Sequence, residues 1–211
     1  MAVVVVEDHP ASAVADPAPL GLAAFALTTF LLSGHNAGFI PDVIWLGAAL
    51  AYGGLVQLLA GMWEFRNRNV FGATAFSSYG GFWLTLGAFV LIITTTKLGT
   101  GLDVLSSEAW FTIAFAIFNS YMLLWSARLN WAIFGVFLTL EVTEILLAIG
   151  FLLDAHGHGD GWIKVGGWAG LVTAAVAWYA SAAGVANGMP DGPALPVGKP
   201  IARLRLRSGQ R

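Results

Sequence analysis

The chain alternates between long apolar runs and short polar segments, and this pattern predicts its architecture. Six runs carry little or no charge away from their ends: 20–40, 43–63, 73–96, 108–127, 129–153 and 162–186. A helix of about 20 apolar residues spans the hydrocarbon core of a bilayer, and the connections between these runs are short. The sequence therefore predicts an all-α integral membrane protein, a six-transmembrane-helix bundle in which consecutive helices run antiparallel.

The composition supports this architecture and narrows the chemistry. Hydrophobic residues make up 57% of the 211 residues and charged residues 10%, whereas a soluble domain carries about 25% charged residues. The absence of cysteine excludes disulfides, thiolate catalysis and Cys-ligated metals. The sequence contains no hydrolase, zinc-protease or P-loop motif, and the turn DAHGHGD offers no rigid frame for a metal. We therefore expect no enzyme activity, no metal and no cofactor.

Lysine and arginine are divided unequally between the two ends of the predicted bundle. The turns near 64–72 and 128 and the C-terminal tail hold most of them: Arg66, Arg68, Arg128, Lys199, Arg203, Arg205, Arg207 and Arg211. The opposite end holds only Lys97 and Lys164. Because an excess of basic residues marks the cytoplasmic side, we expect a multi-pass plasma (inner) membrane protein with both termini in the cytoplasm.

This topology divides the chain into three parts. We expect a cytoplasmic N-terminal tail over 1–19, a six-span domain over 20–186 and a basic cytoplasmic tail over 187–211. The stretch MPDGPALPVGKP in the last part is typical of a flexible linker. Six tryptophans near the predicted helix ends are expected to anchor the helices at the membrane interfaces: Trp45, Trp63, Trp110, Trp125, Trp131 and Trp162.

Two acids, Glu141 and Glu144, lie in the middle of the fifth run. An ionised acid at that depth costs about 2.5–3.5 kcal/mol on insertion scales, and burial disfavours its charged form. At about 100° per residue, Leu140 shares one stripe of the helix with both acids. The sequence supports two interpretations, a proton-binding site or structural acids that join two helices by hydrogen bonds.

Other polar side chains within the runs also have two interpretations. His35 and Asn36 lie in SGHNAGF near the end of the first run, and Thr74, Ser77 and Ser78 lie in FGATAFSSYGG. Polar groups inside a span face protein or water, and helical hydroxyls often donate to the carbonyl four residues earlier. These side chains therefore form either internal hydrogen bonds or the polar lining of a path for a solute.

The stretch DPAPLGL, ahead of the first run, is suited to a helix start. With Asp16 as the N-cap, Pro17 takes the first helical position and Pro19 the third, and the Asp16 carboxylate can accept a hydrogen bond from Ala18 N–H. The prolines remove two of the four backbone donors that a helix start leaves free. We interpret the motif as one that fixes where the first helix begins rather than as an anion site.

Three sets of motifs together resemble the acetate uptake transporter family, the succinate–acetate permease (SatP-like) group. They are DPAPLGL with SGHNAGF, YGGLVQLLAGMWEF with FGATAFSSYGGFW, and EILLAIGF. The resemblance runs from residue 16 to about residue 186. It implies six transmembrane helices, cytoplasmic termini, a homohexamer with one pathway per protomer, and passage of acetate and related small carboxylates such as succinate.

The resemblance also implies a pathway. The family's narrow hydrophobic constriction falls on Phe25, Tyr79 and Leu140. Polar lining of the pathway is then expected from His35, Asn36, Gln57, Thr74, Ser77 and Ser78.

The chain departs from the family at two places. Asp16 stands where the family has Asn, and Glu141 and Glu144 lie beside Leu140, where family members usually have apolar or hydroxyl residues. Fixed negative charge near an anion path repels the solute. We therefore expect protonated acids, a neutral or proton-linked substrate, or a substrate other than acetate.

The leading hypothesis is a membrane transporter or channel for acetate and succinate, in which Glu144 and Glu141 bind the coupled proton. Its partners would be the carboxylate, membrane lipid and further copies of the chain, with no nucleic acid. The alternatives are a transporter of another small solute such as ammonium, and a non-transporting membrane sensor.

Overall fold

The computed structural model describes residues 14–41, 43–97, 100–192 and 194–202. Its elements are α1 (Ala18–Asn36), α2 (Ile44–Ala48), the π-helical η1 (Ala49–Val56), α3 (Gln57–Arg66), α4 (Val70–Thr95), α5 (Val104–Ser126), α6 (Trp131–Ala155) and α7 (Gly161–Gly188). The segments α2, η1 and α3 follow one another without a break and form one span. The structure thus has six helical segments long and apolar enough to cross a membrane. This confirms the predicted six-helix bundle, and the described residues include no strand.

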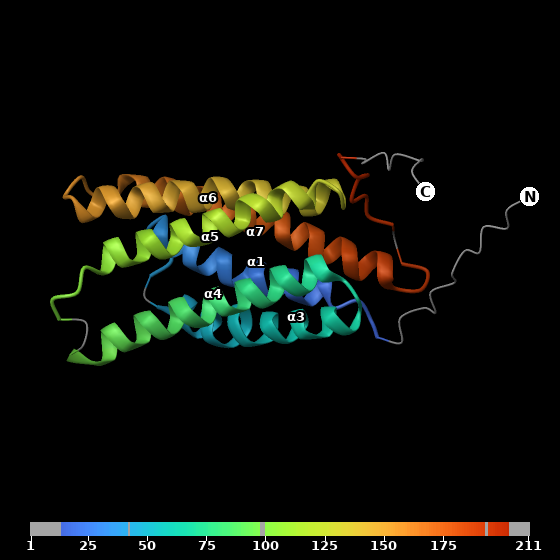
Figure 1. Cartoon of the computed structure of the whole chain (residues 1–211), viewed down its shortest axis with the longest axis horizontal. Helices are drawn as coiled ribbons and strands as arrows, with labels where there is room; N and C mark the ends of the chain where they lie inside the picture. The colour runs from blue at the N-terminus through green and yellow to red at the C-terminus, as the bar shows by residue number, and fades with distance from the viewer. Residues whose placement is uncertain (1–13, 42, 98–99, 193, 203–211) are drawn as a thin grey trace, which may run out of the picture.

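The six spans lie side by side in one bundle (Figure 1). Helix α1 packs along α7, α7 along α6 and α6 along α5, while α4 packs along η1 and α3, which also contact α1. Because the spans alternate in direction, the start of α1 and the end of α7 lie at the same end of the bundle (Figure 1). We call this the terminal end and the opposite one the distal end.

Helix α1 begins one residue later than the sequence predicted. Pro17 is its N-cap and Ala18 its first residue, and Gly21 N–H donates to Pro17 O. Ala18 N–H does donate to Asp16 Oδ1, at 3.0 Å, as expected. The prolines and Asp16 therefore define the start of the first span.

Side-chain caps set the starts of three other spans. The side chain of Asn69 accepts from Gly72 N–H before α4, and that of Asn130 accepts from Ile133 N–H before α6. Asp103 accepts from Ser106 N–H before α5, and hydrogen bonds from Ser106 lower the pKa of Asp103. This cap starts α5 at residue 104 rather than at the predicted 108.

Residues 194–202, which we call the C-terminal strap, correct the prediction of a flexible linker. Val197 O accepts from Ala132 N–H at the start of α6, and Ala127 O at the end of α5 accepts from Ile201 N–H. The strap therefore satisfies backbone groups that the ends of α5 and α6 leave without intrahelical partners. Four arginines of the predicted basic tail lie outside the described residues: Arg203, Arg205, Arg207 and Arg211.

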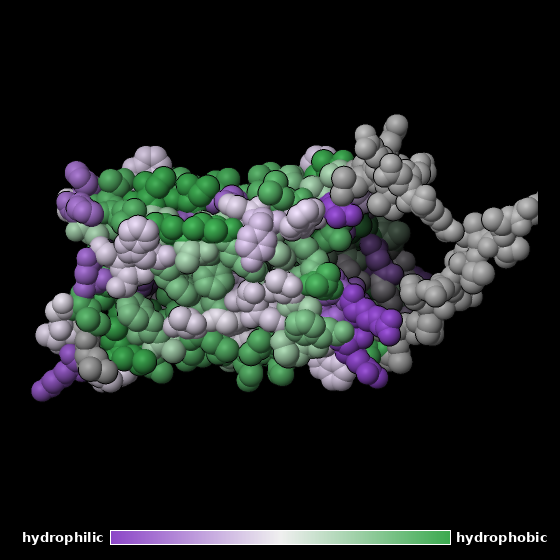
Figure 2. Space-filling view, in the orientation of Figure 1, coloured by the Kyte–Doolittle hydropathy of each residue, from purple (hydrophilic) through white to green (hydrophobic). Residues whose placement is uncertain are grey.

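Apolar side chains cover the length of the bundle, and hydrophilic ones gather at its two ends (Figure 2). Five of the six tryptophans predicted to lie at membrane interfaces are exposed on the protein surface: Trp63, Trp110, Trp125, Trp131 and Trp162. For Trp45 that prediction is wrong. Its side chain is buried and lies beside the His35 ring, because α2 turns it toward α1.

Candidate functional site

Two cavities enter the bundle from its opposite ends. The distal cavity, of about 150 Å³, is lined by α1, α2, α4, α5 and α6 and extends from Phe25 toward Asn36 and Glu108. The terminal cavity, of about 450 Å³, is lined by the starts of α1, α4 and α6, the end of α7 and the C-terminal strap. Asp16 and Val197 both contribute to its wall.

A single hydrophobic layer separates the two cavities. On each of three helices, one residue lines the terminal cavity and the residue three positions later lines the distal cavity. Three residues of an α-helix span about 4.5 Å along its axis. The pairs are Leu22 and Phe25 on α1, Phe76 and Tyr79 on α4, and Phe137 and Leu140 on α6, and all six side chains belong to one buried cluster.

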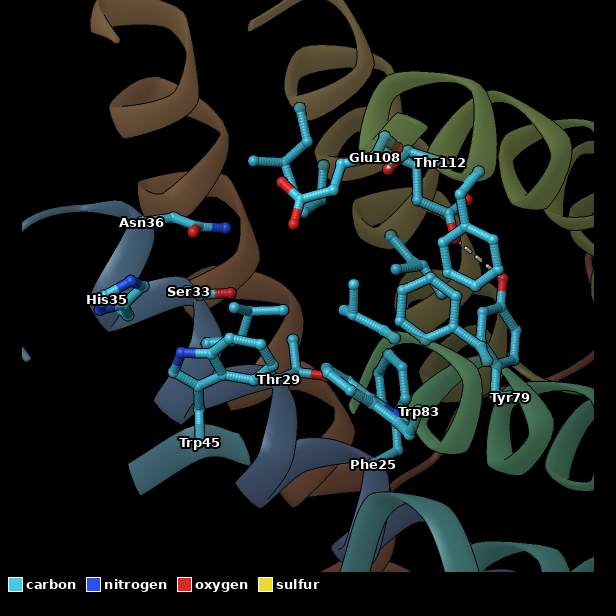
Figure 3. Close-up of a pocket in the computed structure, with 18 of the residues that line it drawn as sticks. Phe25, Thr29, Ser33, His35, Asn36, Trp45, Tyr79, Trp83, Glu108 and Thr112 are labelled. Atoms are coloured by element: carbon cyan, nitrogen blue, oxygen red, sulfur yellow. Dashed lines mark hydrogen bonds between the residues drawn. The ribbon is translucent and has the colours of Figure 1, made fainter. Parts of the chain in front are cut away.

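The structure brings Phe25, Tyr79 and Leu140 together in this layer, and we call these three residues the neck. Each is less than 7% exposed. The rings of Phe25 and Tyr79 meet edge to face with their centroids 5.7 Å apart. His35 and Asn36, predicted as polar lining, lie in the wall of the distal cavity at its outer part (Figure 3).

Hydrogen-bond donors line one side of the distal cavity. Thr29 and Ser33 extend from α1, Trp45 from α2 and Trp83 from α4 (Figure 3). Among the described residues, Thr29 Oγ1 and the Nε1 atoms of Trp45 and Trp83 have no hydrogen-bond partner. Buried polar groups of this kind are normally satisfied by protein or water, so these three donors are unsatisfied groups in residues of the cavity wall.

The distal cavity is acidic. Glu108 of α5 and Glu144 of α6 both line it, and of the described residues no lysine or arginine does. Glu144 is 4% exposed, and its Oε2 atom has no hydrogen-bond partner in the described part of the chain. Apart from His35 in the outer part of the wall, a carboxylate in this cavity would therefore face acids and neutral donors.

A buried hydrogen-bond network connects the neck to α5. Tyr79 Oη lies 3.0 Å from Asn119 Oδ1 and 3.3 Å from Glu144 Oε1. Asn119 Nδ2 donates to Phe137 O at 2.9 Å and to Glu141 Oε2 at 2.7 Å. The two acids of α6 thus have different surroundings: Glu144 faces the cavity and Tyr79, whereas Glu141 faces α5.

Five residues predicted to line the pathway or to bind the proton lie outside both cavities: Gln57, Thr74, Ser77, Ser78 and Glu141. Thr74 Oγ1 donates to Val70 O, four residues earlier, which is the internal bond that the sequence left open. Ser77 lies against Gly61 at the contact between α3 and α4, and Gln57 is fully buried on α3. Gln57, Thr74, Ser77 and Ser78, which were expected to line the pathway, therefore line neither cavity.

The sequence analysis missed Glu108 and Asn119. Glu108 was placed at the end of a span, whereas α5 begins at Val104 and Glu108 lies more than one turn inside it. The signal for this was Asp103, a strong N-cap residue five positions before the predicted start. Asn119 is an amide in the middle of the fourth apolar run, and a polar residue at that depth is by itself a sign of an internal partner.

The described residues contain no group of three or more His, Asp or Glu side chains placed to hold a metal ion.

The profile of the GPR1/FUN34/yaaH family matches residues 3–191. The chain belongs to this family. Acetate permease A of Emericella nidulans is 40% identical to it over 217 residues, covering 93% of this chain and 72% of the relative. The succinate-acetate/proton symporter SatP of Escherichia coli is 37% identical over 196 residues, covering 88% of this chain and 96% of the relative.

The fold is also that of a known membrane protein. The structure of the bacterial acetate channel SatP superposes on this chain with a TM-score of 0.81 at 35% identity, covering 88% of this chain and 99% of that one. Some other fungal relatives are covered over only 59–67% of their own length. Acetate permease A, the SatP symporter and the SatP channel are all named as proteins that pass solutes across a membrane. With its six helices long and apolar enough to span a membrane, the chain is a multi-pass membrane protein.

Proposed function

We propose that the protein is a transporter or channel that carries acetate and related small carboxylates, such as succinate, across the membrane. The observation that carries this proposal is the pair of cavities separated by one helical turn of buried side chains. A solute in either cavity needs to pass only about 4.5 Å of apolar neck. The names of the relatives support a carboxylate as that solute.

The neck would act as the step at which the solute loses water. Phe25, Tyr79 and Leu140 offer an apolar surface there, apart from the Tyr79 hydroxyl. Thr29 Oγ1 and Trp83 Nε1, just beyond the neck in the distal cavity, can replace part of the lost hydration. A small carboxylate with a short apolar part fits both environments.

The acids of the distal cavity support proton-linked transport. Glu108 and Glu144 repel an anion when they are ionised, and among the described residues no lysine or arginine lines that cavity. A proton bound at Glu144 removes the repulsion next to the neck, as does passage of the neutral acid. We propose that Glu144 binds the coupled proton and that Glu141 influences it from the α5 side.

The family resemblance supports two further parts of the proposal. We propose that the protein works as a homohexamer with one pathway in each protomer, and that both termini face the cytoplasm. The mass of the purified complex, measured by light scattering in detergent, tests the first. The accessibility of a tag at either terminus in intact and permeabilised cells tests the second.

The proposed substrate is tested with purified protein in liposomes. Radiolabelled acetate uptake is measured at two external pH values, with unlabelled succinate, formate and ammonium as competitors. We expect protein-dependent uptake that succinate reduces and that rises as the external pH falls. Uptake no faster than in protein-free liposomes would overturn the proposal, and robust uptake would exclude a non-transporting sensor.

A second candidate substrate, ammonium, is favoured by one observation. Two carboxyl groups and no lysine or arginine line the distal cavity within the described residues, and such a cavity attracts a cation. If ammonium is the substrate, ammonium rather than succinate will compete in the same assay, and a pulse of ammonium will change the internal pH faster with the protein than without it.

A further inference from the structure

The orientation of the Asn119 amide is fixed by its neighbours. Asn119 on α5 is fully buried. One end of its amide lies 2.9 Å from the carbonyl oxygen of Phe137, which has no proton to give. That end must therefore be the Nδ2 group, which also donates to Glu141 Oε2. The other end, Oδ1, consequently faces the Tyr79 hydroxyl at 3.0 Å.

The Tyr79 hydroxyl has one proton to donate, and two oxygens lie within hydrogen-bond distance of it, Asn119 Oδ1 and Glu144 Oε1. Asn119 Oδ1 can only accept, so the bond between them requires Tyr79 to donate. Glu144 Oε1, at 3.3 Å, then faces the lone pairs of Tyr79 Oη. That second contact is favourable only when Glu144 carries a proton and donates it to Tyr79.

When Glu144 is ionised, the direction of these hydrogen bonds changes. Its carboxylate attracts the Tyr79 proton more strongly than the neutral amide does. When the proton turns toward Glu144, Asn119 Oδ1 is left buried without a donor, which is unfavourable. The hydroxyl of the neck tyrosine thus has two orientations, and the proton on Glu144 selects between them.

We propose that Asn119 is a positioning residue that couples the proton on Glu144 to the hydroxyl of Tyr79 at the neck. With Glu144 protonated, Tyr79 is held to α5 through Asn119. When Glu144 releases its proton, Tyr79 bonds to α6 instead and its link to α5 is lost. The inference rests on the proposed passage of a solute through the neck, and it gives proton binding a direct structural effect at that point.

The surrounding titratable groups fit this assignment. Glu141 accepts from Asn119 Nδ2 through Oε2 and from Ser120 Oγ through Oε1, both at 2.7 Å, so each of its carboxyl oxygens has a donor on α5 and neither is directed at Tyr79. The other titratable groups that face this site are Glu108 and Tyr121 on α5, His35 on α1 and Tyr79 itself on α4. Helix α7 contacts α6 through the hydroxyls of Thr143 and Thr173 and contributes no titratable residue to the described cavity wall.

The inference is tested by infrared difference spectroscopy on the full chain in lipid. At neutral pH we expect the carbonyl band of a protonated carboxyl, absent in Glu144→Gln. In Asn119→Leu, Tyr79 can donate to an ionised Glu144 without leaving a buried acceptor unsatisfied. The band should therefore titrate at a lower pH than in the unmodified protein, by about one unit or more.

Ser120→Ala is the matched control. It removes the other hydrogen bond to Glu141 and leaves Tyr79 and Asn119 in place. We expect its band to titrate within a few tenths of a unit of the unmodified protein. A band that titrates alike in Asn119→Leu and in the unmodified protein, or equal shifts in Asn119→Leu and Ser120→Ala, would overturn the inference.

If Asn119→Leu does not fold, Tyr79→Phe tests the same link. Without the hydroxyl, the Glu144 proton has no acceptor there, so the carboxyl band should move to the frequency of a carboxyl without a hydrogen bond, and an unmoved band would contradict the inference. The spectroscopic result is separate from the transport result. If the titration of the carboxyl band depends on Asn119 but the protein transports no acetate, the proposed function is refuted and the coupling of Glu144 to Tyr79 through Asn119 still holds. If the protein transports acetate but the titration of the band does not depend on Asn119, only the inferred coupling is refuted.

Discussion

The rings of Phe25 and Tyr79 meet edge to face, 5.7 Å between centroids, in the layer that separates the distal from the terminal cavity. Phe25 extends from α1 and Tyr79 from α4, so the contact joins two helices across the centre of the bundle. In the proposed pathway, the size of the Phe25 side chain therefore determines how much space the neck leaves for a solute.

Phe25→Ala should widen the neck and reduce its selectivity for size. We expect the ratio of succinate to acetate uptake in proteoliposomes to rise severalfold. The loss of a buried aromatic ring costs about 3–5 kcal/mol of stability, so folding is checked by gel filtration. Phe30→Ala is the control, because Phe30 lies on the same helix, packs against Trp178 and lines neither cavity. An unchanged ratio in Phe25→Ala would place the size-selective step elsewhere.

Glu144→Gln should make the rate of acetate uptake independent of the external pH. The amide keeps the size of the side chain and an oxygen that can accept from Tyr79, but it cannot bind a proton at neutral pH. We expect the rise of acetate uptake at low external pH to disappear in this variant and to persist in Glu108→Gln, which alters the other acid of the cavity. If Glu144→Gln keeps the pH dependence of the unmodified protein, Glu144 is not the coupling group.

Asp16→Asn should preserve folding and ease access of carboxylates to the terminal cavity. The Asn side chain also has an oxygen that can accept from Ala18 N–H, so the start of α1 is retained. The variant removes one negative charge from the cavity wall. We expect faster acetate flux from the terminal side in the variant, and no change in Asp191→Asn, an exposed acid near that end of the bundle. A large loss of flux in Asp16→Asn would show that the charge itself is required.

Removal of the C-terminal strap should destabilise the bundle. Truncation after residue 192 deletes the partners of Ala132 N–H and Ala127 O and the Val197 contribution to the terminal cavity. Ala127 O accepts from both Ile201 N–H and Ala202 N–H, so three backbone hydrogen bonds to α5 and α6 are lost. At about 1 kcal/mol per hydrogen bond, we expect these three to cost about 3 kcal/mol. Loss of the bonds of Tyr179 and Asn187 to the strap adds to this, so the melting temperature should drop clearly. Truncation after residue 202 keeps the strap and should melt like the full chain. Equal melting of the two truncations would show that the strap has no structural role.

The sequence could predict the spans because a helix that crosses the membrane must be apolar along its whole length, whether a side chain faces lipid or another helix. This requirement produces the long apolar runs. The assembly of Phe25, Tyr79 and Leu140 could be predicted only from the motifs that resemble the family. Their separation by 54 and 61 positions, respectively, leaves no local signal that they meet.

The direction in which a side chain points was less predictable. Ser77 and Ser78 precede Tyr79 directly, yet only Tyr79 lines the distal cavity. Rotation of α4 about its axis decides this, and a helix that is apolar on all sides gives no sign of its rotation. The strap was misjudged for a related reason: its composition is that of a linker, and its partners on α5 and α6 are far from it in the sequence.

The central claim, that solute passes between the cavities through the neck, is tested most directly with one introduced thiol. The chain has no cysteine, so Leu140→Cys carries a single thiol in the neck and Leu138→Cys one on the exposed face of the same helix. A small neutral thiol reagent is applied to each variant in proteoliposomes before acetate uptake is measured. We predict that labelling of Leu140→Cys blocks uptake, that acetate slows this labelling, and that labelled Leu138→Cys transports normally. Full labelling of Leu140→Cys with undiminished acetate uptake would contradict the account.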